Sequence, residues 1–343
     1  MNNSIIKIVP YLCIVAGGIV LCVGCKEIEA LPSPLHTEKP VEIQNDKPSK
    51  TGPKANIRVC TYNIQNFTDG IDDGVYRTPS VTDWQARNAA KILKNIGADI
   101  VFIEEIENRH ILKRLNDYMD SPYPIVFITQ FDSKRRNGKL NIAILSHWPI
   151  DEVHELDFKH VNDPARPPRG AISAQINLGQ DHHLLLYGVH LKSNYGNRKT
   201  NIRKRQAGLR IIHKDAMDIM SSADSSRTWE VMIIGDMNVD PDAEAFKEDL
   251  SLDPVKDWKD LWRGFPIEER ASLPKRDGDP DIDYPAVAFD RAIVSSALTE
   301  KPWVAKRPYV VRQGVDINNV FVKPGQNEIH VSDHYPVYVD LVR

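Results

Sequence analysis

A buried-strand pattern that ends in polar residues occurs at 231–239, where four apolar residues and a glycine precede Asp236, Met237 and Asn238. Residues two apart in a strand point to one face, so we expect Asp236 and Asn238 to enter one cleft. A carboxylate can take a proton from water or hold a divalent cation, and an amide can donate to a phosphoryl oxygen. The pair suits phosphate chemistry, although a strand ending in an Asx turn has the same residues.

Further strand patterns also carry polar residues at an end. These residues are Asn63 after 57–62, Glu104 and Glu105 after 98–103, His190, Lys192 and Asn194 at the end of 183–194, Asp290 near the start of 288–295, and Asp333 and His334 before 335–341. Strand alternation sends Glu104 and Glu105 to opposite faces, so only one should enter a given cleft. If the strand persists past His190, then Lys192 and Asn194 share its face. Taken alone, each residue also has a structural interpretation: Asn63 as a turn residue, Glu104 and Glu105 as a helix start, His190 as a structural residue, and Ser332-Asp333 as a helix cap or turn.

Amphipathic segments separate these strand patterns and would position them. A helix is predicted to start at Thr82 and Asp83 and to end at Gly97. A second helix is predicted over 197–214, and its outer face would carry Arg203, Arg205 and Arg210. We interpret that basic face first as a solvated surface and second as a contact for a polyanion. The same two interpretations apply to the basic loop at 131–139, whereas 240–285 shows no assignable chemistry.

The N-terminus has the composition of a targeting segment. An apolar run at 8–23 is short for a membrane span and fits a signal peptide better. It ends in Leu21-Cys22-Val23-Gly24-Cys25, which resembles a bacterial lipobox, so we expect a signal peptide over 1–25 and lipidation of Cys25. A plain secretory signal or an uncleaved anchor remains open. Residues 26–55 contain five prolines and predict a flexible tether before a domain at 56–343.

The composition excludes some classes of protein. Lys plus Arg number 44 and Asp plus Glu number 47, a net charge of −3, so the chain lacks the overall basic field of many nucleic-acid binders. Any site for a polyanion must be local. Three of the four cysteines lie in the first 25 residues, which argues against a disulfide framework. Cys60, within a strand pattern, is expected to be a buried thiol.

Taken together and in order, these stretches resemble the endonuclease/exonuclease/phosphatase family, which includes DNase I-like nucleases. The matching positions are Tyr62-Asn63, Ile103-Glu104-Glu105, Val189-His190-Leu191, Gly235-Asp236-Met237-Asn238, Phe289-Asp290 and Ser332-Asp333-His334. The resemblance implies an α/β fold, a four-layer sandwich of two mixed β-sheets packed face to face with helices outside. The alternation of apolar strands and amphipathic helices agrees with this fold class.

The resemblance also implies roles for the matching residues. Glu105 and Asp333 would hold a divalent metal with Asn63 nearby, and Asp236 would orient or deprotonate the attacking water. Asn238 and His190 would bind phosphoryl oxygens, and His334, paired with Asp290, would do likewise or act as acid and base. The ion would be Mg²⁺, with Mn²⁺ or Ca²⁺ as alternatives.

Two positions depart from the family pattern. Glu104 stands where the family usually has Gln, which would add charge beside the site. Arg291 stands where the family commonly has an aromatic residue or His, which weakens the expected pairing of Asp290 with His334.

Three functions remain in competition. The first is a secreted or membrane-anchored, Mg²⁺-dependent phosphodiesterase, monomeric and acting on nucleic acid, placed at the outer membrane in a Gram-negative cell because Lys26 follows Cys25. The second keeps the chemistry but hydrolyses a phospholipid or an inositol phosphate, which the near-neutral charge and the anchor favour. The third is a non-catalytic surface-binding protein with the same fold.

Overall fold

The computed structural model describes residues 55–73, 77–131, 140–223, 226–275, 285–317 and 330–343, and every structural statement below concerns these. The predicted signal peptide, its Cys25, the tether up to residue 54 and the basic loop at 132–139 lie outside them. Among the described residues, no helix has the length and apolar character needed to cross a membrane.

Two β-sheets form the centre of the domain. The strands of the seven-stranded sheet are β11 (Val304–Ala305), β13 (Val337–Val342), β1 (Asn56–Phe67), β2 (Ile100–Ile106), β4 (Asn141–Ser146) and β3 (Ile125–Ile128) in spatial order, with β12 (Tyr309–Val310) also paired to β13. The strands of the six-stranded sheet are β5 (Glu152–Leu156), β6 (Ala171–Gly179), β7 (His182–His190), β8 (Thr228–Asp236), β10 (Asp290–Val294) and β9 (Lys259–Asp260). Both sheets are mixed, because β1 runs parallel to β2 and β7 runs parallel to β8 while the other pairs are antiparallel.

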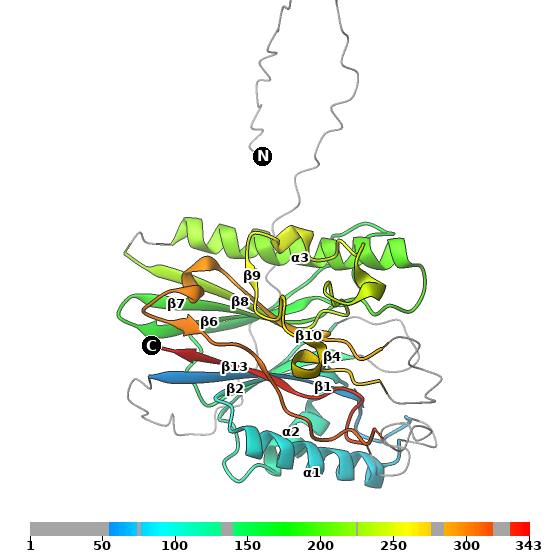
Figure 1. Ribbon diagram of the computed structural model, residues 1–343. Coiled ribbons are helices and arrows are strands. Elements are labelled where there is room, and N and C mark those ends of the chain that lie inside the picture. The colour runs from blue at the N-terminus through cyan, green and yellow to red at the C-terminus, as the bar shows by residue number, and fades with distance from the viewer. Residues whose placement is uncertain (1–54, 74–76, 132–139, 224–225, 276–284, 318–329) are drawn as a thin grey trace, which may run out of the picture. The chain divides into compact units, whose positions relative to one another are not determined.

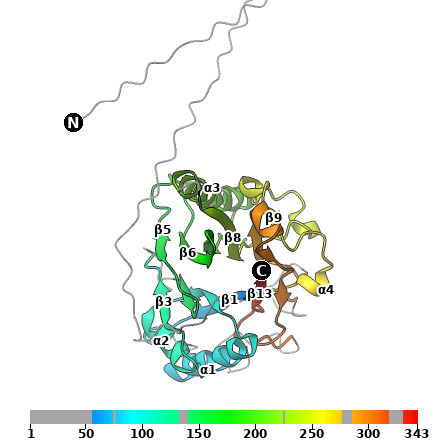
Figure 2. The ribbon, with the colours of Figure 1, turned by 90° about the vertical axis from the view of Figure 1, so that its left-hand side faces the viewer.

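Helices cover the outer faces of the two sheets (Figures 1 and 2). The helices are α1 (Pro79–Ile96) and α2 (Arg109–Asp117) on the seven-stranded sheet, α3 (Arg198–Ser222) on the six-stranded sheet, the short α4 (Ile267–Arg270), and three 3₁₀ helices at Glu244–Phe246, Asp253–Val255 and Ser296–Thr299. The order of layers is therefore helix, sheet, sheet, helix. The predicted four-layer α/β sandwich is confirmed.

Most of the hydrophobic core lies in three slabs, one between the sheets and one under each helical layer, and a smaller fourth cluster surrounds Trp262. In the central slab, Phe102 of β2 packs against Gly188 of β7. A Cβ on Gly188 would lie 2.1 Å from a ring carbon of Phe102, so only glycine allows the two strands to approach this closely. This contact holds together the sheets whose strand ends carry the polar residues predicted from the sequence.

Local signals in the chain fix the bounds of helix α1. Thr78 is the N-cap, and its hydroxyl accepts a hydrogen bond from the backbone N–H of Val81. The helix then begins at Pro79, because proline at the first position supplies a helical φ and lacks an N–H that would have no partner. The predicted start at Thr82 and Asp83 was wrong by about one turn. The predicted end at Gly97 is correct, and this glycine has a φ of 60°.

Candidate active site

Polar residues from both sheets meet where the strands β1, β2, β7, β8 and β10 come together. In the six-stranded sheet, Asp236 at the end of β8 lies opposite His190 of β7 on one side and opposite Asp290 of β10 on the other. In the seven-stranded sheet, Asn63 of β1 lies opposite Glu104 of β2. Strand register therefore places these side chains in two rows, one in each sheet.

Asn63 and His190 connect the two rows. The amide nitrogen of Asn63 donates to Asp236 at 3.1 Å and to Glu105 at 3.5 Å. The Nε2 atom of His190 lies 3.5 Å from the same Asp236 oxygen and 3.7 Å from the same Glu105 oxygen. These four residues, predicted separately from four strand ends, form one cluster across the sheet interface.

The backbone is strained at Glu105, whose φ of 62° lies in the left-handed region. The pairing of β2 shifts register between Glu104 and Ile106, so Glu105 is the bulged residue. Its second carboxylate oxygen accepts a hydrogen bond of 2.8 Å from the backbone N–H of Asn66, itself at a φ of 49°. A non-glycine residue in this region costs on the order of 1 kcal/mol or more and is found preferentially at functional sites.

Asn238 reaches the cluster by a turn and not by strand alternation. Strand β8 ends at Asp236, and Asn238 has a φ of 53°. Its backbone N–H donates to the Oδ1 atom of Asp236 at 2.8 Å, which is the Asx turn considered as the alternative interpretation. Its side-chain amide donates to the carbonyl of Leu191 at 3.2 Å. The strand-alternation argument was therefore wrong, although the two residues do lie together.

His334 and Asp290 form a buried pair beside the cluster. The Nδ1 atom of His334 lies 2.7 Å from Asp290, and its Nε2 atom lies 4.0 Å from Asp236. The hydroxyl of Ser332 accepts from the backbone N–H of His334 at 3.0 Å and donates to the carbonyl of Asn63 at 2.6 Å. Ser332 thus fixes the imidazole relative to strand β1.

The surroundings give the two imidazoles opposite protonation states. Burial opposes a charged ring at His334, but the carboxylates of Asp290, Asp333 and Asp236 outweigh it and raise the pKa of His334 well above its usual range. Burial, together with nearby cations, lowers the pKa of His190 well below its usual range. These shifts favour an imidazolium at 334 and a neutral imidazole at 190 near pH 7.

Asp236 has the titration behaviour of a base that works near neutral pH. Burial raises its pKa to about 7, against the opposing effect of the His334 charge and the hydrogen bond from the Asn238 backbone. A general base is most effective when its pKa lies near the working pH. Asp236 can therefore be largely ionised above neutrality while still accepting a proton from water.

The oxygen atoms predicted to hold a metal suit a hard cation. The side-chain oxygen of Asn63 is buried and has no hydrogen-bond partner among the described residues, so it is available to a ligand. Gln65, two residues further along β1, donates to Asp333 at 2.8 Å and holds that carboxylate next to the strand. Asn63 and Glu105, which lie together, and Asp333, held by Gln65, carry oxygen donors of the kind that Mg²⁺ and Ca²⁺ prefer. Sequence reasoning missed Gln65, although its spacing from Asn63 in one strand could have indicated it.

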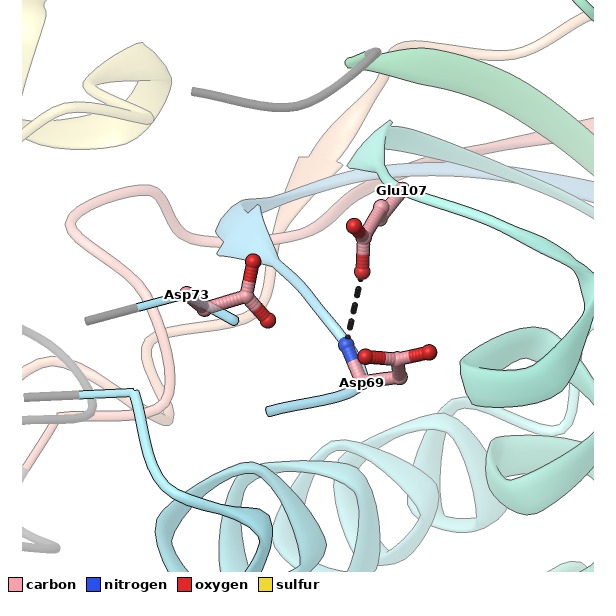
Figure 3. A group of neighbouring side chains, drawn as sticks. All are labelled: Asp69, Asp73 and Glu107. Carbon is pink, nitrogen blue, oxygen red and sulfur yellow. Dashed lines mark hydrogen bonds between the residues drawn. The ribbon is translucent and has the colours of Figure 1, made fainter. Parts of the chain in front are cut away.

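A second group of carboxylates lies near the end of β2, formed by Asp69, Asp73 and Glu107 (Figure 3). Oxygen atoms of the three lie within 4.8 Å of one another. Glu107 accepts from the backbone N–H of Asp69 at 2.9 Å (Figure 3), and Asp73 accepts from that of Gly70 at 2.9 Å. These hydrogen bonds order the loop after β1. The group shares no residue with the predicted metal set, and the sequence pattern gave no signal for it.

Glu104 does not add charge beside the site as expected. It is fully buried, and the hydroxyl of Thr61 donates to it. Burial, with the nearby negative charges of Asp290 and Asp236, raises the pKa of Glu104 well above its usual range. The neutral acid is thereby favoured, so Glu104 resembles the amide of Gln in charge.

The expected grouping of His190, Lys192 and Asn194 on one strand face was wrong. Strand β7 ends at His190. The ammonium of Lys192 donates to the carbonyls of Ser193 and Tyr195, at 2.8 Å in both cases. Asn194 donates to the backbone carbonyl of Asn238 at 2.9 Å. Lys192 and Asn194 therefore brace a loop, and only His190 joins the cluster.

Arg205 and Arg291 also differ from expectation. Arg205 was predicted on the solvated face of its helix but is fully buried, where it donates to Asp249 at 2.7 Å. Arg291 is fully buried too, and it pairs with Asp260 at 2.7 Å and with Asp240 at 3.3 Å. Arg291 therefore does not disturb the pair of Asp290 and His334. The carboxylates that neutralise Arg205 and Arg291 all come from the segment 240–285.

Comparison with known proteins gives a family and a fold. The model of the Endonuclease/Exonuclease/phosphatase family matches residues 60–334. No curated protein matches the sequence significantly.

Solved structures share the fold at low sequence identity. Truncated TDP2 of Caenorhabditis elegans is 18% identical, with a TM-score of 0.55 over 84% of this chain and 98% of that one. TDP2 of D. rerio, complexed with single strand DNA product, is 18% identical, with a TM-score of 0.56 over 84% and 100%. An endonuclease/exonuclease/phosphatase from Beutenbergia cavernae is 17% identical, with a TM-score of 0.55 over 84% and 72%. At such identities the likeness shows the fold alone.

Proposed function

Because this chain belongs to the endonuclease/exonuclease/phosphatase family, whose fold is that of phosphoric ester hydrolases, we propose that it is a metal-dependent phosphodiesterase that cleaves nucleic acid. The observation that carries the proposal is the cluster of Asn63, Glu105, His190 and Asp236, joined by distances of 3.1 to 3.7 Å across two sheets. The D. rerio TDP2 structure with single strand DNA product supports nucleic acid as the substrate class.

Asp236 would take a proton from the attacking water. Its pKa of about 7 suits that role, and the amide of Asn63, at 3.1 Å, would orient its carboxylate. His190 and Asn238 flank Asp236 and would contact the phosphoryl oxygens. His334, held charged by Asp290, would donate to a phosphoryl oxygen or to the departing oxygen as negative charge develops there.

Asn63, Glu105 and Asp333 would hold the divalent ion, which we propose to be Mg²⁺, with Mn²⁺ or Ca²⁺ as alternatives. Their oxygen donors and the free buried oxygen of Asn63 fit such an ion. When bound, the ion would stabilise negative charge on the phosphoryl group.

We further propose that the enzyme acts outside the cytoplasm as a monomer, tethered through lipidated Cys25 at a membrane. The support is the lipobox-like sequence at 21–25. Labelling cells with a radioactive fatty acid should mark the wild-type protein but not Cys25→Ser. Equal labelling of both, or of neither, would contradict lipidation at this residue.

The test of the activity compares the full-length chain on single-stranded DNA, double-stranded DNA and RNA, in Mg²⁺ and in EDTA. We expect cleavage with Mg²⁺, none with EDTA, and recovery when Mg²⁺ is restored. Glu105→Gln should raise the Mg²⁺ concentration needed for half activity about tenfold or more. Arg210→Met, a change on the exposed face of α3, is the matched control and should behave as wild type.

A phospholipid or small phosphoester is the second candidate substrate, favoured by the net charge of −3. Hydrolysis of sphingomyelin or of an inositol phosphate, with nucleic acids left intact, would replace the first proposal by this one. If no phosphoester were hydrolysed under any of these conditions, the chain would retain the fold without the activity.

A further inference from the structure

Among the described residues, Tyr195 is the most exposed of the large hydrophobic side chains. It lies in the segment 191–197, which connects β7 to α3, and 90% of its surface is accessible to solvent. An exposed aromatic ring on a mobile segment would need no explanation. The loop segment 191–197, however, is held by hydrogen bonds along its backbone.

Three side chains fasten the backbone of this loop. Lys192 donates to the carbonyl of Tyr195 at 2.8 Å, and Asn201 donates to the same carbonyl at 3.2 Å. Buried Arg205 donates to the carbonyl of Lys192 at 2.9 Å and to the side chain of Asn194 at 3.2 Å. The backbone on both sides of the ring is therefore fixed, while the ring itself points into solvent. Because the backbone is already fixed, only the side-chain torsions of Tyr195 lose freedom when the ring binds a ligand.

The loop also connects directly to the candidate active site. Asn194, the residue before Tyr195, donates to the backbone carbonyl of Asn238 at 2.9 Å. Asn238 in turn donates to the carbonyl of Leu191, at the start of the loop. Tyr195 thus follows Asn194 directly, and the side chain of Asn194 contacts the turn at Asn238, a proposed phosphate ligand. The loop that carries Tyr195 therefore borders the turn at Asn238.

The charges around the loop identify the kind of substrate. Residues 182–214 contain no Asp or Glu. Arg198, Lys199 and Arg203, in the first turns of α3, are exposed, and none of them pairs with a carboxylate in the part of the chain that the structure describes. Cations next to a single exposed aromatic ring suit a nucleic acid, whose phosphates are negatively charged and whose bases are flat. A membrane contact would require several apolar side chains, whereas Ser193, Gly196 and Asn197 around the ring are small or polar.

We propose that Tyr195 stacks on an unpaired base of a single-stranded nucleic acid next to the scissile phosphate, with Arg198, Lys199 and Arg203 contacting the flanking phosphates. This inference rests on the proposed nuclease function and names the part of the substrate that the loop recognises. Stacking on an aromatic side chain is tolerant of sequence, because every base has a flat face. The enzyme would therefore select single strands without selecting a base.

The experiment uses full-length protein and two single-stranded oligonucleotides of equal length, one with normal bases and one with abasic positions on both sides of the cleavage point. Tyr195→Ala should lower kcat/KM on the normal oligonucleotide about 5- to 150-fold, mainly through KM, as expected for the loss of one stacked base. On the abasic oligonucleotide it should match wild type. Tyr195→Trp should retain activity on the normal oligonucleotide, and Tyr309→Ala, at another exposed tyrosine, is the control.

Salt dependence tests the cations separately. Replacing both Arg198 and Lys199 by Ala should reduce the slope of log KM against log salt by about 0.7 for each phosphate that the variant no longer binds. The stacking proposal is overturned if Tyr195→Ala equals wild type on normal bases or shows the same decrease on the abasic oligonucleotide. It is also overturned if the variant loses only binding to anionic phospholipid vesicles. A wild-type protein that cleaves no oligonucleotide but hydrolyses another phosphoester would instead refute the nuclease function itself.

Discussion

The imidazole of His334 lies 2.7 Å from the carboxylate of Asp290, and both groups are buried. The pair joins the two sheets, because Asp290 begins β10 of one sheet and His334 precedes β13 of the other. A charged ring is thereby held 4.0 Å from Asp236, the proposed base. An acid and a base in one small space can keep different protonation states because their partners differ.

Asp290→Asn is expected to lower the pKa of His334, because the nearest negative charge disappears while the amide can still accept a hydrogen bond. If His334 acts as the charged donor, the alkaline limb of the pH–rate profile should move to lower pH, and the rate at pH 8 should fall about tenfold or more. NMR titration of the His334 ring would measure the shift directly. An unchanged profile would remove His334 from the role of acid.

Asp236→Asn should lower kcat about 10²- to 10⁴-fold, since an amide cannot accept the proton of water. In wild type, the pKa of about 7 predicts that kcat/KM rises with pH up to neutrality as the carboxylate ionises. In the Asp236→Asn variant, kcat/KM should be low and should no longer rise with pH up to neutrality. A variant that kept the limb would show that another group is the base.

Glu104→Gln should leave activity nearly unchanged and increase stability at alkaline pH. The raised pKa of Glu104 means that the folded protein holds a proton that the unfolded chain releases above about pH 4.5. The free energy of unfolding therefore falls as pH rises from there towards the folded-state pKa, and Gln removes this dependence. Urea unfolding should show a gain on the order of 1 kcal/mol or more at pH 8, and a smaller one at pH 5.

Arg205→Met should destabilise the fold by about 3 to 5 kcal/mol, because Asp249 would remain buried without its cation. Arg210→Met, on the exposed face of the same helix, should change the free energy of unfolding by less than about 0.5 kcal/mol. Guanidinium unfolding of both variants gives the comparison. If both variants lowered the free energy of unfolding equally, the ion pair of Arg205 and Asp249 would contribute no more to stability than an exposed arginine does.

The strands and their polar ends could be predicted from the sequence because they follow from local pattern. An apolar run such as 231–234 has few alternatives to a buried strand, and a polar residue at its end must reach an edge of the sheet. The order of these ends along the chain then indicated the family. Asn63, Glu105, His190 and Asp236 were foreseen in this way, and the structure brings them together.

The sequence could not predict which charges are buried. The cation of Arg205 is neutralised by Asp249, 44 residues further along the chain, and helical periodicity places an arginine outside unless its partner is known. The turn at Asn238 and the bulge at Glu105 were missed for a related reason. Their positive φ values depend on hydrogen bonds to Asp236 and Asn66, which a strand pattern does not contain.

The antiparallel pairing of β13 with β1 joins the first and last strands of the domain. Asn63 thus precedes Asp333 by 270 residues in the chain, and His334 follows directly after Asp333. No nascent chain can bring Asn63, Asp333 and His334 together before translation of the domain is nearly over. If the proposed nuclease function holds, the chain therefore stays inactive while most of the domain is being translated.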